Sequence, residues 1–214
     1  MATENKRFNT RILLPLVFPV ILWVIHFASE YGSISLSNYG VLPRHFSGLP
    51  GILTSPLIHG DFSHLLSNTI PLIILGSGIF YFYPNAAFKA MAVVYLLSNT
   101  LVWLFAREVY HIGASGIIYG FVSFFFFSGV FRRDNKSIAL ALLVTVLYGS
   151  LIWGVFPGSQ GVSWESHLFG AVSGVIAAYS FRKIDPSQKY DWEDEELDEN
   201  EKPEISYDID KNDF

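Results

Sequence analysis

The sequence predicts an all-α membrane protein with six transmembrane helices and a long loop between the first two. Of its 214 residues, 51% are hydrophobic and 15% are charged, and the mean hydropathy is +0.36. This composition argues against an ordinary soluble domain. Six apolar stretches have about the 17 to 25 residues needed to cross a hydrocarbon core. They lie at residues 12–28, 64–83, 87–106, 115–131, 138–156 and 166–181.

The first stretch, 12–28, is interpreted as a retained membrane span. A signal peptide would end at a small-residue cleavage site, and this segment runs into a loop without a convincing one. The loop, residues 29–62, contains Gly, Pro and Ser clusters around the apolar patch GLPGILTSPL. We expect the loop to lie in the membrane interface.

Basic residues beside the spans predict the orientation of the chain, because cytoplasmic flanks carry an excess of Lys and Arg. With six spans, only Arg44 and Arg107 fall on the extracytoplasmic side. The basic residues on the other side are Lys6, Arg7, Arg11, Lys89, Arg132, Arg133, Lys136, Arg182 and Lys183. Both termini are therefore predicted to be cytoplasmic.

The end of the chain, residues 184–214, is predicted to be a disordered acidic cytoplasmic tail. Residues 185–214 hold 13 of the 19 acidic residues and three lysines, a net charge of −10 that leaves +5 for the rest. Such a segment cannot bury enough apolar surface to offset its ordering entropy, so it is either a solvating tail or a docking segment. The charge distribution argues against a nucleic-acid partner. The absence of cysteine excludes thiolate metal sites and a cysteine nucleophile.

Polar residues inside the spans are informative, because each is costly in lipid unless it faces protein or water. His64 and Asn68 are four residues apart and share one face of the second span, while Ser115 begins the fourth span and His167 the sixth. At about 1.5 Å per residue, Asn68, Ser115 and His167 lie roughly 22 to 25 Å above the cytoplasmic ends of their spans. We therefore expect a shared polar cavity that opens outward.

Glycines predict how the fourth and sixth spans meet. Gly113 would allow the backbone to turn tightly before Ser115. G-x-x-x-G pairs begin at Gly116 and at Gly170, just below His167. Either these pairs are generic packing motifs, or they let the two spans approach closely and bring Ser115 and His167 together.

A serine beside a histidine allows acyl transfer, because neutral imidazole can take the proton of the weakly nucleophilic hydroxyl. No acid within the spans lies near this depth, which favours a two-residue dyad of Ser115 and His167. The backbone N–H of Ser115 and the side chains of His64 and Asn68 could stabilise the oxyanion. Tyr119, one turn below Ser115, either supports the imidazole or serves only in packing.

Three motifs lie on the second, fourth and sixth spans: HLLSN at 64–68, GASG at 113–116 and SHLFGAVSG at 166–174. Through them the sequence resembles the rhomboid family of intramembrane serine proteases. Each motif alone is a weak signal, but the three together are specific. The resemblance implies a six-transmembrane-helix rhomboid-like bundle, which we take as one protease domain at 12–183 after a short cytoplasmic N-terminus at 1–11.

The resemblance also implies a role for each candidate residue. Ser115 is expected to be the nucleophile and His167 the general base. The residues expected to stabilise the oxyanion or substrate are His64, Asn68, Gly113 and Ala114, with Tyr119 and His59 in support. His59 matches a histidine near the cavity mouth in the family, or else it is a solvated loop residue before a helix cap.

Two loop features of the family are less clear in this sequence. The Trp-Arg pair of its first loop cannot be placed here, and Arg44 is expected to take part of its structural role. The segment FPGSQGVSWE before His167 looks like the flexible cap over the site. Trp164 in that segment either gates access or anchors the chain at the interface.

These implications together predict a serine endopeptidase of a prokaryotic plasma membrane that needs no cofactor. Its partners would be the lipid bilayer and transmembrane protein substrates, cleaved in or near the membrane on the extracytoplasmic side. One alternative is a rhomboid-like scaffold that binds transmembrane helices without cutting them. Another is a channel or transporter with His64, Asn68 and His167 as a polar path, which does not explain GASG at a helix start.

Overall fold

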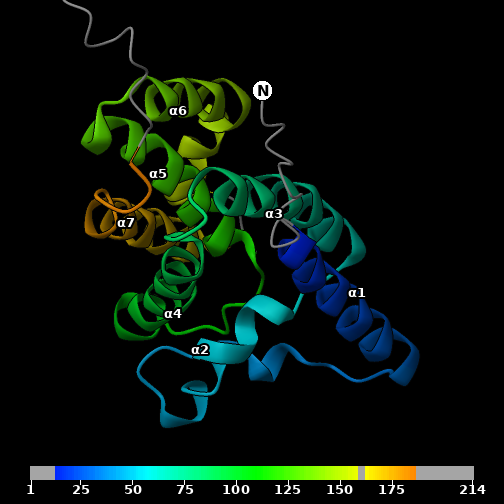
Figure 1. Ribbon diagram of the computed structural model, residues 1–214. Helices are drawn as coiled ribbons and strands as arrows, with labels where there is room; N and C mark the ends of the chain where they lie inside the picture. The colour runs from blue at the N-terminus through cyan, green and yellow to red at the C-terminus, as the bar shows by residue number, and fades with distance from the viewer. Residues whose placement is uncertain (1–12, 159–161, 187–214) are drawn as a thin grey trace, which may run out of the picture.

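The computed structural model describes residues 13–158 and 162–186, and the described chain is built from helices and loops (Figure 1). Seven α-helices are present in these residues, together with short 3-10 helices and one isolated β-bridge. The α-helices are α1 (Leu14–Gly32), α2 (Gly51–Thr54), α3 (Phe62–Phe82), α4 (Ala87–Phe105), α5 (Ser115–Arg132), α6 (Asn135–Tyr148) and α7 (Trp164–Ser180). The predicted all-α class is confirmed.

Five helices in the described part of the chain are long and apolar enough to cross a membrane. They are α1, α3, α4, α5 and the stretch Asn135–Val155, in which α6 continues into the 3-10 helix η5 (Gly149–Val155). The protein is therefore an integral membrane protein, as the composition predicts. The sixth predicted span falls on α7, which is only 17 residues long, so the count of six crossings stays a prediction.

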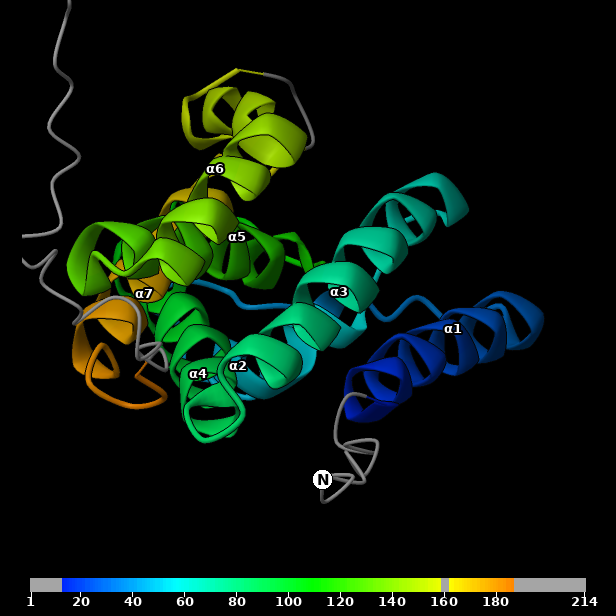
Figure 2. The same ribbon diagram turned by 45° about the horizontal axis from the view of Figure 1, so that its top comes forward.

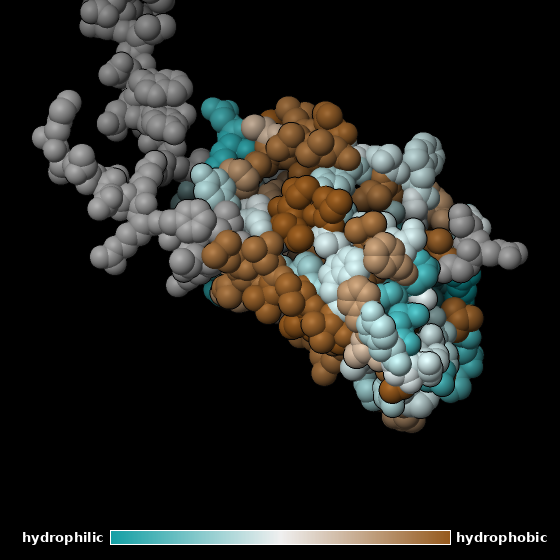
Figure 3. Space-filling view, turned by 90° about the vertical axis from the view of Figure 1, so that its right-hand side faces the viewer, coloured by the Kyte–Doolittle hydropathy of each residue, from teal (hydrophilic) through white to brown (hydrophobic). Residues whose placement is uncertain are grey.

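The helices surround α5, which packs against α3, α4, α6 and α7. In its span 61% of the residues are buried, against 17% in Asn135–Val155. α1 lies beside α3 at one edge of the bundle, and α6 lies at another edge (Figures 1 and 2). Apolar side chains form a broad band over the face shown in Figure 3, as expected for a surface in contact with lipid.

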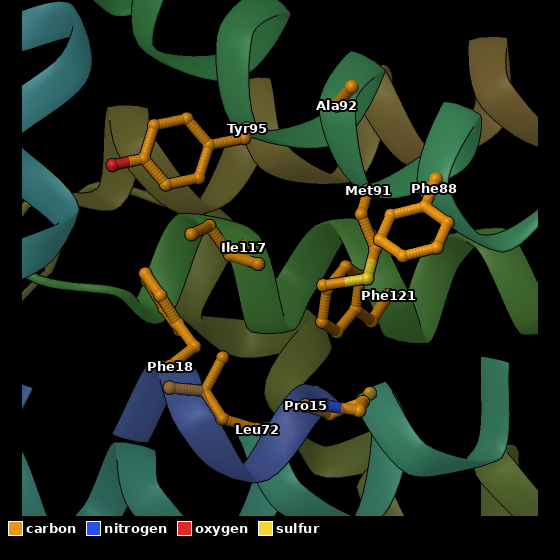
Figure 4. Close-up of a pocket in the computed structure, with 10 residues that line it drawn as sticks. Pro15, Phe18, Leu72, Phe88, Met91, Ala92, Tyr95, Ile117 and Phe121 are labelled. Carbon is orange, nitrogen blue, oxygen red and sulfur yellow. The ribbon is translucent and has the colours of Figure 1, made fainter. Parts of the chain in front are cut away.

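α1 reaches the bundle mainly through α3. An apolar cavity of about 290 Å³ lies between these two helices and α4 and α5 (Figure 4). Pro15 of α1, Leu72 of α3, Met91 of α4 and Phe121 of α5 line it. The cavity is separate from the polar residues predicted to form the site.

The segment between α1 and α3 runs along one end of the bundle and contains α2 (Figure 1). Val41 in this segment pairs with His111 through two backbone hydrogen bonds of 2.9 Å. The Arg44 guanidinium donates to the carbonyl of Ala106 at 2.6 Å. Arg44 therefore ties the segment to the end of α4, a structural role of the kind expected for it.

α5 and α7 meet through their glycines. A Cβ at Gly170 would overlap the carbonyl oxygen of Gly116, and one at Gly174 would overlap the carbonyl oxygen of Gly120. A Cβ at Gly116 would in turn lie 2.9 Å from the carbonyl oxygen of Ser166. Of the two interpretations that the G-x-x-x-G pairs left open, the structure has the close approach of these two helices, and it places their first turns side by side.

The predicted ends of the protease domain fall partly outside the described residues. Residues 1–12 and 187–214, the latter most of the predicted tail, are among those not described. Asp185, which the sequence analysis assigned to the tail, instead packs on the fold. Its carboxylate accepts hydrogen bonds from the backbone N–H groups of Asn85 and Ala86. These donors lie at the start of α4, where a helix favours negative charge.

Candidate active site

Ser115 is the first residue of α5, and Gly113 shapes the backbone that leads to it. Gly113 has a φ of +107°, which side-chain-bearing residues rarely adopt. A Cβ at this position would lie 2.7 Å from Cε1 of His64. Glycine is therefore required here both for the turn and for the close approach of the imidazole.

Ser115 and His167 are brought into direct contact. His167 lies in the first turn of α7, and its Nε2 is 2.9 Å from Oγ of Ser115. Its Nδ1 is 2.9 Å from the carbonyl oxygen of Gly154 in η5. A carbonyl oxygen can only accept, so Nδ1 carries the proton and Nε2 is free to accept from the Ser115 hydroxyl.

The His167 ring is also fixed on its face. Tyr119 stacks on it with a centroid distance of 4.1 Å and an angle of 6° between the ring planes. A Cβ at Gly154 would overlap the Tyr119 hydroxyl and lie 3.1 Å from Nδ1 of His167. The absence of a side chain at Gly154 is therefore what lets the η5 backbone reach the imidazole.

Gly113 and Ala114 use their N–H groups to hold the loop before Ser115. The Gly113 N–H donates to the carbonyl of Ser55 at 2.9 Å, and the Ala114 N–H donates to Nε2 of His59 at 3.3 Å. Both donors are therefore engaged within the protein and support this turn, and the expected role of Gly113 and Ala114 in stabilising an oxyanion or substrate stays a prediction.

His59 is buried, with 8% of its surface exposed, and so is not a solvated loop residue. Its ring lies edge to face with that of His64 at a centroid distance of 5.0 Å. Burial, and then the neighbouring His64, lower the pKa of His59 to about 3. The imidazole is therefore neutral near pH 7, as an acceptor of the Ala114 N–H must be.

His64 and Asn68 lie on α3, as predicted. Asp61 caps this helix by accepting from the backbone N–H of His64 at 2.8 Å. Asn68 is 4% exposed, and its side-chain NH₂ group has no hydrogen-bond partner among the described residues. A buried amide donor left unpaired costs about 1 to 3 kcal/mol, so this group is a candidate donor to a substrate.

Two charged residues near the site were missed by sequence reasoning. Glu165 is 3% exposed and lies in the first turn of α7, two residues before His167. Its Oε1 is 3.0 Å from Nε of the half-exposed Arg107. The expectation that no acid lies near this depth overlooked Glu165, because the predicted span began at residue 166. The carboxylate is nevertheless not the hydrogen-bond partner of His167, whose Nδ1 is bonded to Gly154.

The predicted cap is described only in part, because residues 159–161 lie outside the described chain. Trp164 is half-buried and is the first residue of α7, so it belongs to the helix. Within residues 13–158 and 162–186, no group of three or more His, Asp or Glu side chains could hold a metal ion.

Comparison with known proteins gives consistent matches. A family model described as a Rhomboid domain matches residues 47–184, a range that contains all the candidate site residues. The uncharacterized protein Rv1337 of Mycobacterium tuberculosis is 34% identical over 186 residues, 83% of this chain and 78% of that protein. YdcA of Bacillus subtilis, provisionally named a rhomboid protease, is 24% identical over 135 residues, 60% of this chain and 65% of that protein. The RHOMBOID-like protein 4 of Arabidopsis thaliana is 26% identical over 136 residues, 60% of this chain and 33% of that protein.

Proposed function

Because this chain belongs to the rhomboid family, we propose that it is an intramembrane serine protease. Ser115 attacks a peptide carbonyl in or beside a transmembrane segment of the substrate. His167 takes the hydroxyl proton and later gives it to the leaving amine, and water then hydrolyses the acyl-enzyme. The observation that carries this proposal is the 2.9 Å contact between Ser115 Oγ and His167 Nε2.

The Gly154 carbonyl does the orienting that a carboxylate does in other serine proteases. It accepts from Nδ1 of His167, which fixes the tautomer that leaves Nε2 as a base. A carbonyl dipole also stabilises the imidazolium that forms during attack. Unlike a carboxylate, it places no full charge in a membrane-embedded site, where an unpaired ion is costly.

Three donors are available for the oxyanion. The backbone N–H of Ser115 belongs to the first turn of α5, whose N–H groups have no intrahelical acceptor and carry the positive end of the helix dipole. Asn68 supplies its unpaired NH₂ group and His64 an imidazole. A donor of this kind contributes about 2.7 to 4 kcal/mol to the transition state of acyl transfer.

The proposed substrates are transmembrane proteins whose cleaved segment unwinds readily. A transmembrane helix hydrogen-bonds its own carbonyls, so the scissile bond must leave the helix before Ser115 attacks it. Small or helix-breaking residues near that bond reduce the cost of unwinding. We place this reaction in a prokaryotic plasma membrane, with both termini cytoplasmic and the site open to the extracytoplasmic side.

The test is labelling of the purified protein in detergent with a fluorophosphonate probe, which requires an activated serine but no substrate. Wild-type protein should be labelled at Ser115, and Ser115→Ala and His167→Ala should not be labelled. A folded wild-type protein that reacts neither with this probe nor with a smaller serine-reactive inhibitor would contradict the proposal. It would favour a scaffold that binds transmembrane helices without cutting them.

A further inference from the structure

A second histidine–serine contact lies four residues before the first in each of the two segments. His111 is four residues before Ser115, and Ser163 is four residues before His167. Nδ1 of His111 is 2.6 Å from Oγ of Ser163, and its Nε2 is 2.9 Å from the carbonyl oxygen of Arg107. The carbonyl fixes the proton on Nε2, so the Ser163 hydroxyl donates to Nδ1.

The same Ser163 oxygen caps α7. It accepts from the backbone N–H of Ser166 at 3.3 Å, and the Ser166 hydroxyl lies 2.7 Å away. His111 in turn is 2% exposed and is held to Val41 by its two backbone hydrogen bonds. The start of α7 is thus bonded to a side chain that is itself fixed.

An ion pair joins the same two segments of chain. Arg107 pairs with the buried Glu165 through Nε, and Nη2 of Arg107 donates to the carbonyl of Val162 at 2.8 Å. Glu165 is buried while Arg107 is half-exposed, so loss of Arg107 would leave the buried carboxylate without its counter-charge, which is unfavourable. These contacts therefore resist separation of the two segments.

The hydrogen bonds and the ion pair lie at the start of α7, where glycine packing alone would still let this helix tilt or slide against α5. The glycines set the spacing of the two helices, but a contact between smooth backbone surfaces does not by itself stop α7 from tilting or sliding. Directional hydrogen bonds four residues before Ser115 and His167 remove that freedom. The Ser115–His167 pair then lies between a steric contact on one side and polar contacts on the other.

We propose that Arg107, His111, Ser163 and Glu165, here called the connecting cluster, are positioning residues for the reaction. They fix the first turn of α7 against the segment that leads into α5. In this way they hold Nε2 of His167 within hydrogen-bond reach of Ser115 Oγ. The inference rests on the proposed function, because it assigns these residues an effect on the reactivity of Ser115.

The experiment compares Ser163→Ala with Ser163→Thr and a matched control. The alanine variant loses both the α7 cap and the bond to His111, whereas threonine keeps the hydroxyl. The control is Asp134→Ala, which removes the side-chain cap of α6, an acceptor of the Ser137 N–H at 2.9 Å, far from this cluster. Each variant is assayed well below its own Tm, for fluorophosphonate labelling rate and for kcat and KM on a transmembrane substrate.

Ser163→Ala should lower the labelling rate and kcat by roughly tenfold to a hundredfold with KM nearly unchanged, because the reacting groups are misplaced while the binding surface is kept. Ser163→Thr should restore both rates. Asp134→Ala should lower Tm without changing either rate. Glu165→Gln, which keeps the side-chain volume, should lower kcat in the same way. It replaces Ser163→Ala in the experiment if that variant does not fold.

Wild-type labelling rates in folded Ser163→Ala, or in Glu165→Gln where the first variant fails to fold, would overturn the inference and leave the proposed function standing. Failure to label the wild-type protein would overturn the proposed function, and the inference with it.

Discussion

Gly170→Ala should separate α5 from α7 and so disable the Ser115–His167 pair. The added Cβ would overlap the carbonyl oxygen of Gly116 and lie 3.0 Å from its Cα. Non-bonded carbon atoms pack at about 3.5 to 4.0 Å, so the contact to Cα alone requires the two backbones to move apart by at least about 0.5 to 1 Å. Both atoms belong to helix backbone, and no side chain can rotate to relieve the overlap.

A displacement of this size acts directly on the hydrogen bond between Ser115 and His167. Along the line of the bond, it would lengthen the 2.9 Å contact between Ser115 and His167 to about 3.4 to 3.9 Å, past the range of an effective hydrogen bond. A misplacement of about 1 Å can reduce turnover by about 100-fold. Overpacking should also lower the free energy of unfolding by about 1 to 3 kcal/mol.

The assay is the rate of substrate cleavage, measured below the Tm of each variant and compared with the rate of fluorophosphonate labelling. Gly78→Ala is the matched control, because its Cβ would meet a side chain, that of Phe125 at 3.1 Å from Cζ, and no helix backbone. That variant should keep wild-type turnover. Wild-type turnover in folded Gly170→Ala would refute the reasoning that the spacing of α5 and α7 sets the geometry of the site.

Three further predictions concern residues around the site. His59 has a folded pKa of about 3 against an ordinary 6.5, so below pH 6.5 the unfolded state binds more protons and stability falls as pH falls toward 3. At pH 5 the lowered pKa of His59 reduces the free energy of unfolding by about 2 kcal/mol. Tm measured against pH for the wild type and for His59→Gln should therefore give a flatter profile in the variant. Asn68→Ala should lower kcat by about 10²- to 10³-fold with little change in KM, and an effect confined to KM would contradict an oxyanion role. Tyr119→Phe keeps the ring stacked on His167 and should retain turnover within a few-fold, whereas Tyr119→Leu should not; equal rates would show that stacking is unimportant.

The sequence predicted the helical elements, and it offered the close packing that brings Ser115 and His167 together as one of two interpretations of the glycine pairs. Apolar runs of membrane length predict helices, because the bilayer leaves few other options for the backbone. Glycines four residues apart allow a close helix contact for a local steric reason without naming the partner helix, and the structure has that contact between α5 and α7. Gly113, at the turn before Ser115, has the positive φ that such a turn requires.

The sequence alone could not predict the remaining contacts of the site, for physical reasons. The Gly154 carbonyl has no sequence signature, because every residue carries one and only the path of η5 brings this one to His167. The contact between His111 and Ser163 joins residues 52 positions apart, and hydrophobic periodicity in a single sequence does not predict contacts between distant segments. Ser163 is a local signal for the start of α7, since a serine just before an apolar helix is a common cap. A helix that begins after Ser163 includes Glu165 in its first turn.

The proposed site holds Ser115 and His167 mainly with neutral atoms, and this determines which substitutions can disable it. A carbonyl orients His167, a helix start presents Ser115, and the nearby buried carboxylate of Glu165 is paired with Arg107. This arrangement avoids an unpaired ion in a membrane-embedded site. Backbone groups move only when their helix or loop moves, so one methyl group at the Gly170 contact should slow the proposed reaction nearly as much as loss of the Asn68 side chain.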